Sequence, residues 1–275
     1  MSAGISISIG IGVSIEPTEV GVDPDAQAFI IAAGITDPTQ QEAINTLVVD
    51  LKASGLWTLL QAIYPIVGGT ATTHKYNLKN PLDTDGAFRL TFGLGWTHGT
   101  TGMTPNGTTA FADTKFNPNA DLLSYTSCSI GIYSRTDTVL DGVDIGASGG
   151  GSPGNIYVRP ASTTVTFLNG RQGTPNEIAV TLPNTQGLLA CSRGTLTSFE
   201  AFQNGSSVGS NATSMFPLPV AANFFLGARG NSGVADLFSR RELAFGVIGP
   251  RLNAGQNLSL YNSVQAYQTT LNREV

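Results

Sequence analysis

The sequence predicts a mainly β protein: an antiparallel β-sandwich or jelly roll, preceded by a β arm and a helical segment and closed by a helix. Short runs rich in β-branched and aromatic residues recur from Tyr76 onward at a spacing of about 8–12 residues, separated by glycine, asparagine and proline. Between residues 23 and 65, and again after Asn253, apolar residues recur at helical spacing instead.

The N-terminal segment alternates strictly between aliphatic and small residues. On an extended strand, six side chains fall on one face: Ile5, Ile7, Ile9, Ile11, Val13 and Ile15. Each buried aliphatic side chain is worth about 1.5–3 kcal/mol, so this face needs a partner. The partner is either the chain's own sheet or a neighbouring chain. Pro17 and Pro24 separate the segment from the rest, which favours an assembly arm over residues 1–22.

Residues 23–75 are expected to form a helical connector. Asp37 can cap a helix that begins at Pro38. The apolar positions that follow have the spacing of one helical face: Ile44, Leu47, Val48 and Leu51. The apolar run resumes after Gly55, and the helical pattern is expected to continue to Ile63.

Residues 76–275 are expected to form the sandwich domain with its closing helix. Asn204-Gly205 is a dipeptide typical of tight hairpin turns, and Asn253 can cap the final helix. Strands are expected at Ala87–Phe92, Ser127–Tyr133, Asn155–Arg159, Thr163–Leu168, Glu177–Thr181, Gly187–Ser192, Ser198–Gln203, Ala222–Gly227 and Glu242–Ile248.

The chain is acidic and poor in charge. Charged residues make up 12 % of the 275 residues, the net charge is −5, and the pI is about 4.9. These values argue against a nucleic-acid partner. With no basic leader and no apolar run of about 20 residues, we expect no signal peptide and no membrane insertion. Cys128 and Cys191 fit two buried thiols better than a bridge, as in a protein made in a reducing cytoplasm.

Four segments near the C-terminus occur in the order of a known cassette. They are FEAFQNGS at 199–206, FLG at 225–227, LAFGVIG at 243–249 and Leu260-Tyr261 in the closing helix. In this order they resemble laminin-G-like, concanavalin A-like jelly rolls. The resemblance covers about a quarter of the chain and implies the same sandwich fold.

Segments upstream of this cassette, at 28–41, 55–57, 62–65 and 74–79, resemble a region that precedes the jelly roll in bacteriophage virion proteins. The resemblance implies a structural protein of a tail, fibre or capsid surface, made in the host cytoplasm and located in the virion. It implies other virion proteins as partners, a homo-oligomer such as a trimer, and contact with a host surface glycan. A stand-alone carbohydrate-binding module is the alternative, and a glycanase is less favoured.

No catalytic constellation is evident, so the chain is expected not to be an enzyme and to need no cofactor. Retaining glycanases hold two carboxylates about 5–5.5 Å apart, which requires an alternating acidic pair on a strand, and no expected strand carries one. Only two histidines occur, and His98 at a strand end is more typical of a structural residue than of a general base. No zinc-ligand spacing occurs, and Asp137, Asp141 and Asp144 are weak calcium candidates.

Glycan binding needs an aromatic surface beside hydrogen-bonding side chains. The candidate residues are Trp96, His98, Asn106, Asn155 and Tyr157. For Trp96 and Tyr157 the alternative is burial in the core of the sandwich.

Overall fold

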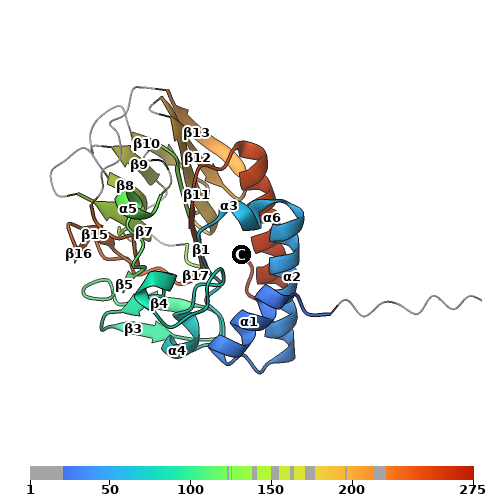
Figure 1. The fold of residues 1–275 in the computed structure, drawn as a ribbon. Coiled ribbons are helices and arrows are strands. Elements are labelled where there is room, and N and C mark those ends of the chain that lie inside the picture. Colours follow the sequence, from blue (N-terminus) through green and yellow to red (C-terminus); the bar gives the residue numbers. More distant parts are fainter. Residues whose placement is uncertain are drawn as a thin grey trace, which may run out of the picture.

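A computed structural model describes residues 21–122, 124, 126–137, 141–149, 155–161, 164–170, 177–195, 197–212 and 221–275. Within these residues the expected β-sandwich is confirmed. Two sheets face each other. A layer of helices covers one of the sheets on the side that points away from the other sheet (Figure 1).

The sheet beneath the helices, here the inner sheet, has eight described strands. Their bounds are β1 Ala62–Tyr64, β3 Trp96–His98, β4 Met103–Pro105, β6 Cys128–Ser134, β11 Gly187–Thr195, β12 Ser198–Gln203, β13 Ser206–Asn211 and β17 Leu243–Gly249. The order is β13-β12-β11-β6-β17-β4-β3, and β1 pairs with β17. All of these pairings are antiparallel.

The second sheet, here the outer sheet, has nine described strands. Their bounds are β2 Thr91–Phe92, β5 Ala112–Asp113, β7 Ile145–Ser148, β8 Asn155–Ala161, β9 Thr164–Gly170, β10 Glu177–Thr181, β14 Phe225–Leu226, β15 Arg229–Asn231 and β16 Val234–Asp236. The order is β10-β9-β8-β7-β14-β5-β2, with the β15–β16 hairpin joined to β7. The β15–β7 pairing is parallel and the others are antiparallel.

The helices are short except for two. They are α1 Pro24–Ala33, α2 Pro38–Ala53, α3 Leu56–Leu59, α4 Ala71–His74, α5 Pro118–Asp121 and α6 Ala254–Thr270, with a 3-10 turn η1 at Asp85–Ala87. The caps predicted from the sequence are confirmed at both long helices. Asp37 accepts a hydrogen bond from the Gln40 amide, and Asn253 forms a capping box with Gln256. None of the described helices combines the length and apolar character needed to cross a bilayer.

Alternation along the strands of the inner sheet divides the core in two. On β17, Leu243 and Ile248 point between the two sheets, whereas Ala244 and Val247 point at the helices. The helical layer buries Ile44, Leu47, Val48 and Leu51, which confirms the predicted apolar face. The segment 23–75 therefore packs on the sandwich, and the three-part division of the chain stays a prediction.

The predicted end of one helix is wrong. The helical pattern was expected to continue to Ile63, but α3 ends at Leu59 and β1 follows. Gly55 has φ 72° and breaks the helix, and Ile63 donates its amide to the side chain of Asn77 at 2.9 Å. An apolar run fully buried in a sheet cannot be distinguished from a helix by periodicity.

Most of the expected strands are confirmed, but the one at Ala87–Phe92 shrinks to Thr91–Phe92. Residues 85–87 form η1 instead, and Phe88 has φ 59°, which extended structure does not allow. The Asn204-Gly205 turn between β12 and β13 is confirmed, with φ of 49° and 75° as a type I′ turn requires.

Arg273 is buried and links the end of the chain to the segment after β1, to β17 and to α6. The side chain is 1 % exposed and donates to the carbonyls of Pro65, Ile66 and Ala244 at 2.7–3.0 Å, and to Gln268 Oε1 at 2.6 Å. Ile66 has φ 47°, an unfavourable value for a β-branched residue. The guanidinium therefore holds a strained backbone in place while satisfying buried carbonyls.

Replacing Arg273 by methionine should lower the free energy of unfolding by about 3 kcal/mol or more, because it leaves buried carbonyls without donors. Urea denaturation followed by tryptophan fluorescence measures the change. Arg251→Met, at an exposed arginine, is the matched control and should stay within about 0.5 kcal/mol of the parent. Equal midpoints for the two variants would contradict the assigned role.

Candidate functional site

A hollow of about 300 Å³ opens on the surface where α4 meets the edge strand β2 of the outer sheet. Its lining combines two cations, two hydroxyls and apolar groups: Ala71, Thr72, Lys75, Arg89, Leu90, Thr91 and Phe92. The volume is at the lower end of ligand sites, which run from about 300 to 1,000 Å³.

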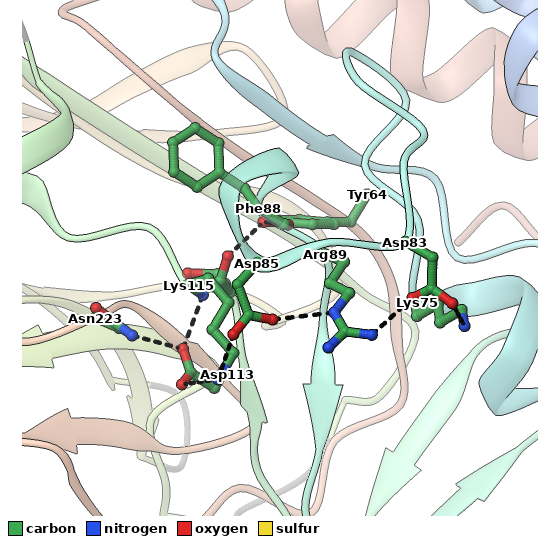
Figure 2. A network of polar contacts seen from close by, with 10 residues as sticks. Tyr64, Lys75, Asp83, Asp85, Phe88, Arg89, Asp113, Lys115 and Asn223 are labelled. Carbon is green, nitrogen blue, oxygen red and sulfur yellow. Dashed lines mark hydrogen bonds and ion pairs between the residues drawn. The ribbon is translucent and has the colours of Figure 1, made fainter.

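A charged strip leaves this hollow and continues along β5 (Figure 2). It consists of six side chains of alternating sign: Lys75, Asp83, Arg89, Asp85, Lys115 and Asp113. Asp83 accepts from Lys75 Nζ at 2.5 Å and from Arg89 at 2.7 Å, and Asp85 accepts from Arg89 Nε at 3.0 Å. Most of the charged residues between 75 and 115 thus belong to one network.

The backbone beneath the charged strip is anchored to the interior. Tyr64 on β1 donates its hydroxyl to the Phe88 carbonyl at 2.7 Å (Figure 2). Leu90 donates its amide to the Lys75 carbonyl at 2.8 Å, which joins the two cation-bearing segments. Asp113 is directly opposite Thr91 in the β2–β5 register. Arg89 and Lys75 are therefore held by the frame of the sandwich.

The ion pairs of the charged strip shift the pKa of two of its members, Asp83 and Arg89. Hydrogen bonds from Lys75 and Arg89 hold the pKa of Asp83 below its usual value. The hydrogen bonds of Arg89 to Asp83 and, second, to Asp85 raise the pKa of Arg89. The ion pairs thus favour the charged forms of Asp83 and Arg89 at the centre of the strip.

Aromatic rings back the hollow on the side of β3. The ring of Phe92 meets that of His98 edge-on at 4.8 Å and that of Trp96 at 5.8 Å. Phe92 both lines the hollow and packs against the core of the sandwich. Two of the residues predicted from the sequence, Trp96 and His98, thus contact Phe92, which lines the hollow, but do not line it themselves.

His98 pairs with His74 on α4. Their Nδ1 atoms are 2.9 Å apart, and His74 Nε2 accepts the Gly69 amide at 3.1 Å. Because Nε2 accepts, this network assigns the His74 proton to Nδ1, which donates to His98 Nδ1. Burial, with smaller contributions from His98 and Arg273, lowers the pKa of His74 to about 3, and burial also lowers the pKa of His98. The pair is neutral, and a further proton would break one of the two hydrogen bonds.

Trp96 and Asn106 satisfy their polar atoms within the fold. Trp96 Nε1 donates to the Phe111 carbonyl at 3.0 Å, and its ring closes on Gly227, where a Cβ would lie 2.7 Å from it. Asn106 Oδ1 accepts three backbone amides of its own loop, those of residues 108 to 110, at 2.9–3.1 Å. Both therefore have structural roles, and Trp96 is partly buried against the core of the sandwich.

Asn155 and Tyr157 lie on β8, in the outer sheet. In that sheet β7, β14 and β5 separate β8 from β2, so at about 4.8 Å per strand their backbone is far from the hollow. The structure thus does not bring the five predicted glycan residues together in one site.

The weak calcium candidates are not brought together either. Asp144 is buried, accepts from Ser239 Oγ at 2.5 Å and lies 3.9 Å from Arg241 Nε. Burial raises the pKa of Asp144 to about 6. Asp137 accepts from Thr185 instead. Within the described part of the chain, no three His, Cys, Asp or Glu residues are placed to hold a metal ion.

Two other predicted features have different outcomes. The assembly-interface residues Ile5, Ile7, Ile9, Ile11, Val13 and Ile15 lie outside the described residues. Cys128 and Cys191 are both free and buried, and burial raises the pKa of each thiol. The expectation of two buried thiols is confirmed.

Sequence reasoning missed the charged strip. Its members are spread from residue 75 to residue 115, and no local motif links them. A signal was nevertheless present. In a chain with 12 % charged residues, three of the four lysines fall between 75 and 115, alongside Asp83, Asp85 and Arg89.

The His74–His98 pair should make folding sensitive to acid. The folded pKa of His74, about 3, lies below the unfolded value of 6.5, so its contribution is complete above pH 6.5 and is lost as pH falls towards 3. Between pH 8 and pH 5 the loss should be about 2 kcal/mol. Urea midpoints across this range measure it. His74→Gln, which does not titrate, should show a smaller slope, and an equal slope would rule out the pair as its source.

The sequence matches no family model and no curated protein. Solved structures with a similar fold include the binding domain of botulinum neurotoxin DC in complex with rat synaptotagmin II, at 9 % identity and TM-score 0.51, covering 76 % of this chain and 52 % of that chain. Botulinum neurotoxin type C, whose cell entry is dependent upon interaction with two ganglioside molecules, matches at 9 % and 0.51, covering 78 % and 53 %.

A mutant Trypanosoma rangeli sialidase displaying trans-sialidase activity matches at 10 % identity and TM-score 0.50, covering 84 % of this chain and 39 % of that chain. The chain spans about half the length, or less, of the structures it matches. At these identities the likeness shows the fold: the chain is a β-sandwich of the architecture found in these proteins.

Proposed function

We propose that this chain is a carbohydrate-binding structural protein of a phage virion surface, and that the hollow beside the charged strip binds the sugar. The observation that carries the binding proposal is the junction of Lys75, Arg89 and Phe92 in one open hollow. It supplies fixed donors, fixed acceptors and an aromatic wall at a sheet edge. Similar folds in a ganglioside-dependent neurotoxin add support at the level of architecture.

Binding without hydrolysis fits the carboxylates best. A glycosidase needs a general acid with a raised pKa near its substrate. At the hollow, hydrogen bonds from Lys75 and Arg89 lower the pKa of Asp83. Asp144 has a raised pKa of about 6, but it is completely buried and cannot reach a sugar. We therefore propose a non-enzymatic role.

The virion role rests on the sequence. The alternating aliphatic residues from Ile5 to Ile15 and the resemblance of segments upstream of the sandwich to phage virion proteins both support it. In this proposal the arm joins copies of the chain to the particle by strand pairing, and the sandwich faces outward.

Arg89→Ala should weaken glycan binding at least about tenfold, because it removes a charge-assisted donor from the hollow. A glycan array with the full chain identifies the bound sugars, and titration calorimetry with the strongest of them gives the affinities. Arg240→Ala, at an exposed arginine that does not line the hollow, is the matched control and should bind like the parent. A sugar bound equally by both variants would place the site elsewhere, and an array with no bound sugar would refute carbohydrate binding.

Deletion of residues 1–20 should convert an oligomer into a monomer without unfolding the sandwich. Size-exclusion chromatography with light scattering measures the mass, and circular dichroism checks the fold. Replacing Ile7, Ile9 and Ile11 by serine in the full chain is a second route to the same loss. A full chain that is already monomeric would refute assembly through the arm.

A further inference from the structure

We propose that the hollow selects a neutral, hydroxyl-rich sugar and rejects sugars that carry a carboxylate or sulfate. The inference rests on the proposed function, because it names the ligand class of the same site. Three features carry it: the charge balance of the charged strip, the strip's mixture of donors and acceptors, and the apolar wall of the hollow.

The positive charges of the hollow are already neutralised. Lys75 and Arg89 share Asp83 at 2.5 and 2.7 Å, and Arg89 also binds Asp85 at 3.0 Å. Over the whole strip, three cations face three carboxylates. An anionic sugar would have to displace Asp83 from two partners or lie beside its charge, and like charges that close repel.

The groups that remain available match hydroxyls. Arg89 has five N–H donors and Lys75 has three, of which the carboxylates engage only some. Each oxygen of Asp83 accepts one hydrogen bond and keeps further lone-pair capacity. A hydroxyl both donates and accepts, so it can bridge Arg89 and Asp83. A carboxylate or sulfate only accepts and leaves Asp83 without a new donor.

The apolar wall suits the C–H face of a sugar ring. Phe92 lines the hollow and is fixed by edge-on contacts with the Trp96 and His98 rings. Leu90, 2 % exposed, continues the wall inward. A hollow of about 300 Å³ fits one ring, so the terminal residue of a glycan is the expected occupant.

The charge of the whole chain acts in the same direction. At −5, the protein repels anions at long range, and both cations that line the hollow are paired with Asp83.

The experiment is an array that presents neutral oligosaccharides beside the same oligosaccharides capped with sialic acid, uronic acid or sulfate. The full chain should bind neutral members, and its affinity should change less than about twofold between 50 and 500 mM NaCl, since no net charge pairs across the interface. Asp83→Asn keeps the shape but removes an acceptor charge, and should weaken neutral binding about tenfold. Glu42→Gln, the same charge change at an exposed position on α2, should bind like the parent.

The outcomes separate the two levels of the proposal. Preference for the acidic members, or tighter binding by Asp83→Asn, would overturn the neutral-sugar inference and leave carbohydrate binding intact. Binding to no member of the array would refute the proposed function and the inference with it. Neutral binding that Asp83→Asn leaves unchanged would also overturn the inference, because it removes the hollow from the recognition.

Discussion

The burial of Arg273 is the constraint on which the arrangement of layers depends. Its guanidinium satisfies backbone carbonyls from the segment after β1 and from β17, and the side-chain amide oxygen of Gln268 on α6, at once. A cation in this place needs every donor matched, because an unmatched buried charge is costly. The helical layer, the inner sheet and the end of the chain must therefore be arranged so that all of these oxygens reach the guanidinium. The contacts of Arg273 also hold the start of the loop that runs from residue 65 to α4, and α4 forms one side of the hollow.

The part of the fold that was predictable from sequence is the part specified locally. Asp37 and Asn253 fix helix starts through their own side chains, and Asn204-Gly205 fixes a turn through backbone preference. β1 was mistaken for helix because its pairing with β17 is made by residues almost two hundred positions away. No local pattern contains that information.

The candidate site was less predictable for the same reason. Two of the aromatic residues chosen from the sequence have structural contacts: Trp96 donates to the Phe111 carbonyl, and His98 is engaged with His74. The groups that face the hollow are ordinary charged residues, which resemble any solvated surface until the fold gathers them. Asp83 and Asp113 are thirty residues apart in the chain, and they become members of one strip because β2 pairs with β5.

The pairing of β1 with β17 also determines when the protein can fold. Residues 62–64 meet residues 246–248, and α2 packs against α6, the last helix. Neither contact can form before residues 246–270 have been synthesised. The N-terminal helices must wait until then with their apolar faces open, so the helical layer is completed late in the folding of the chain.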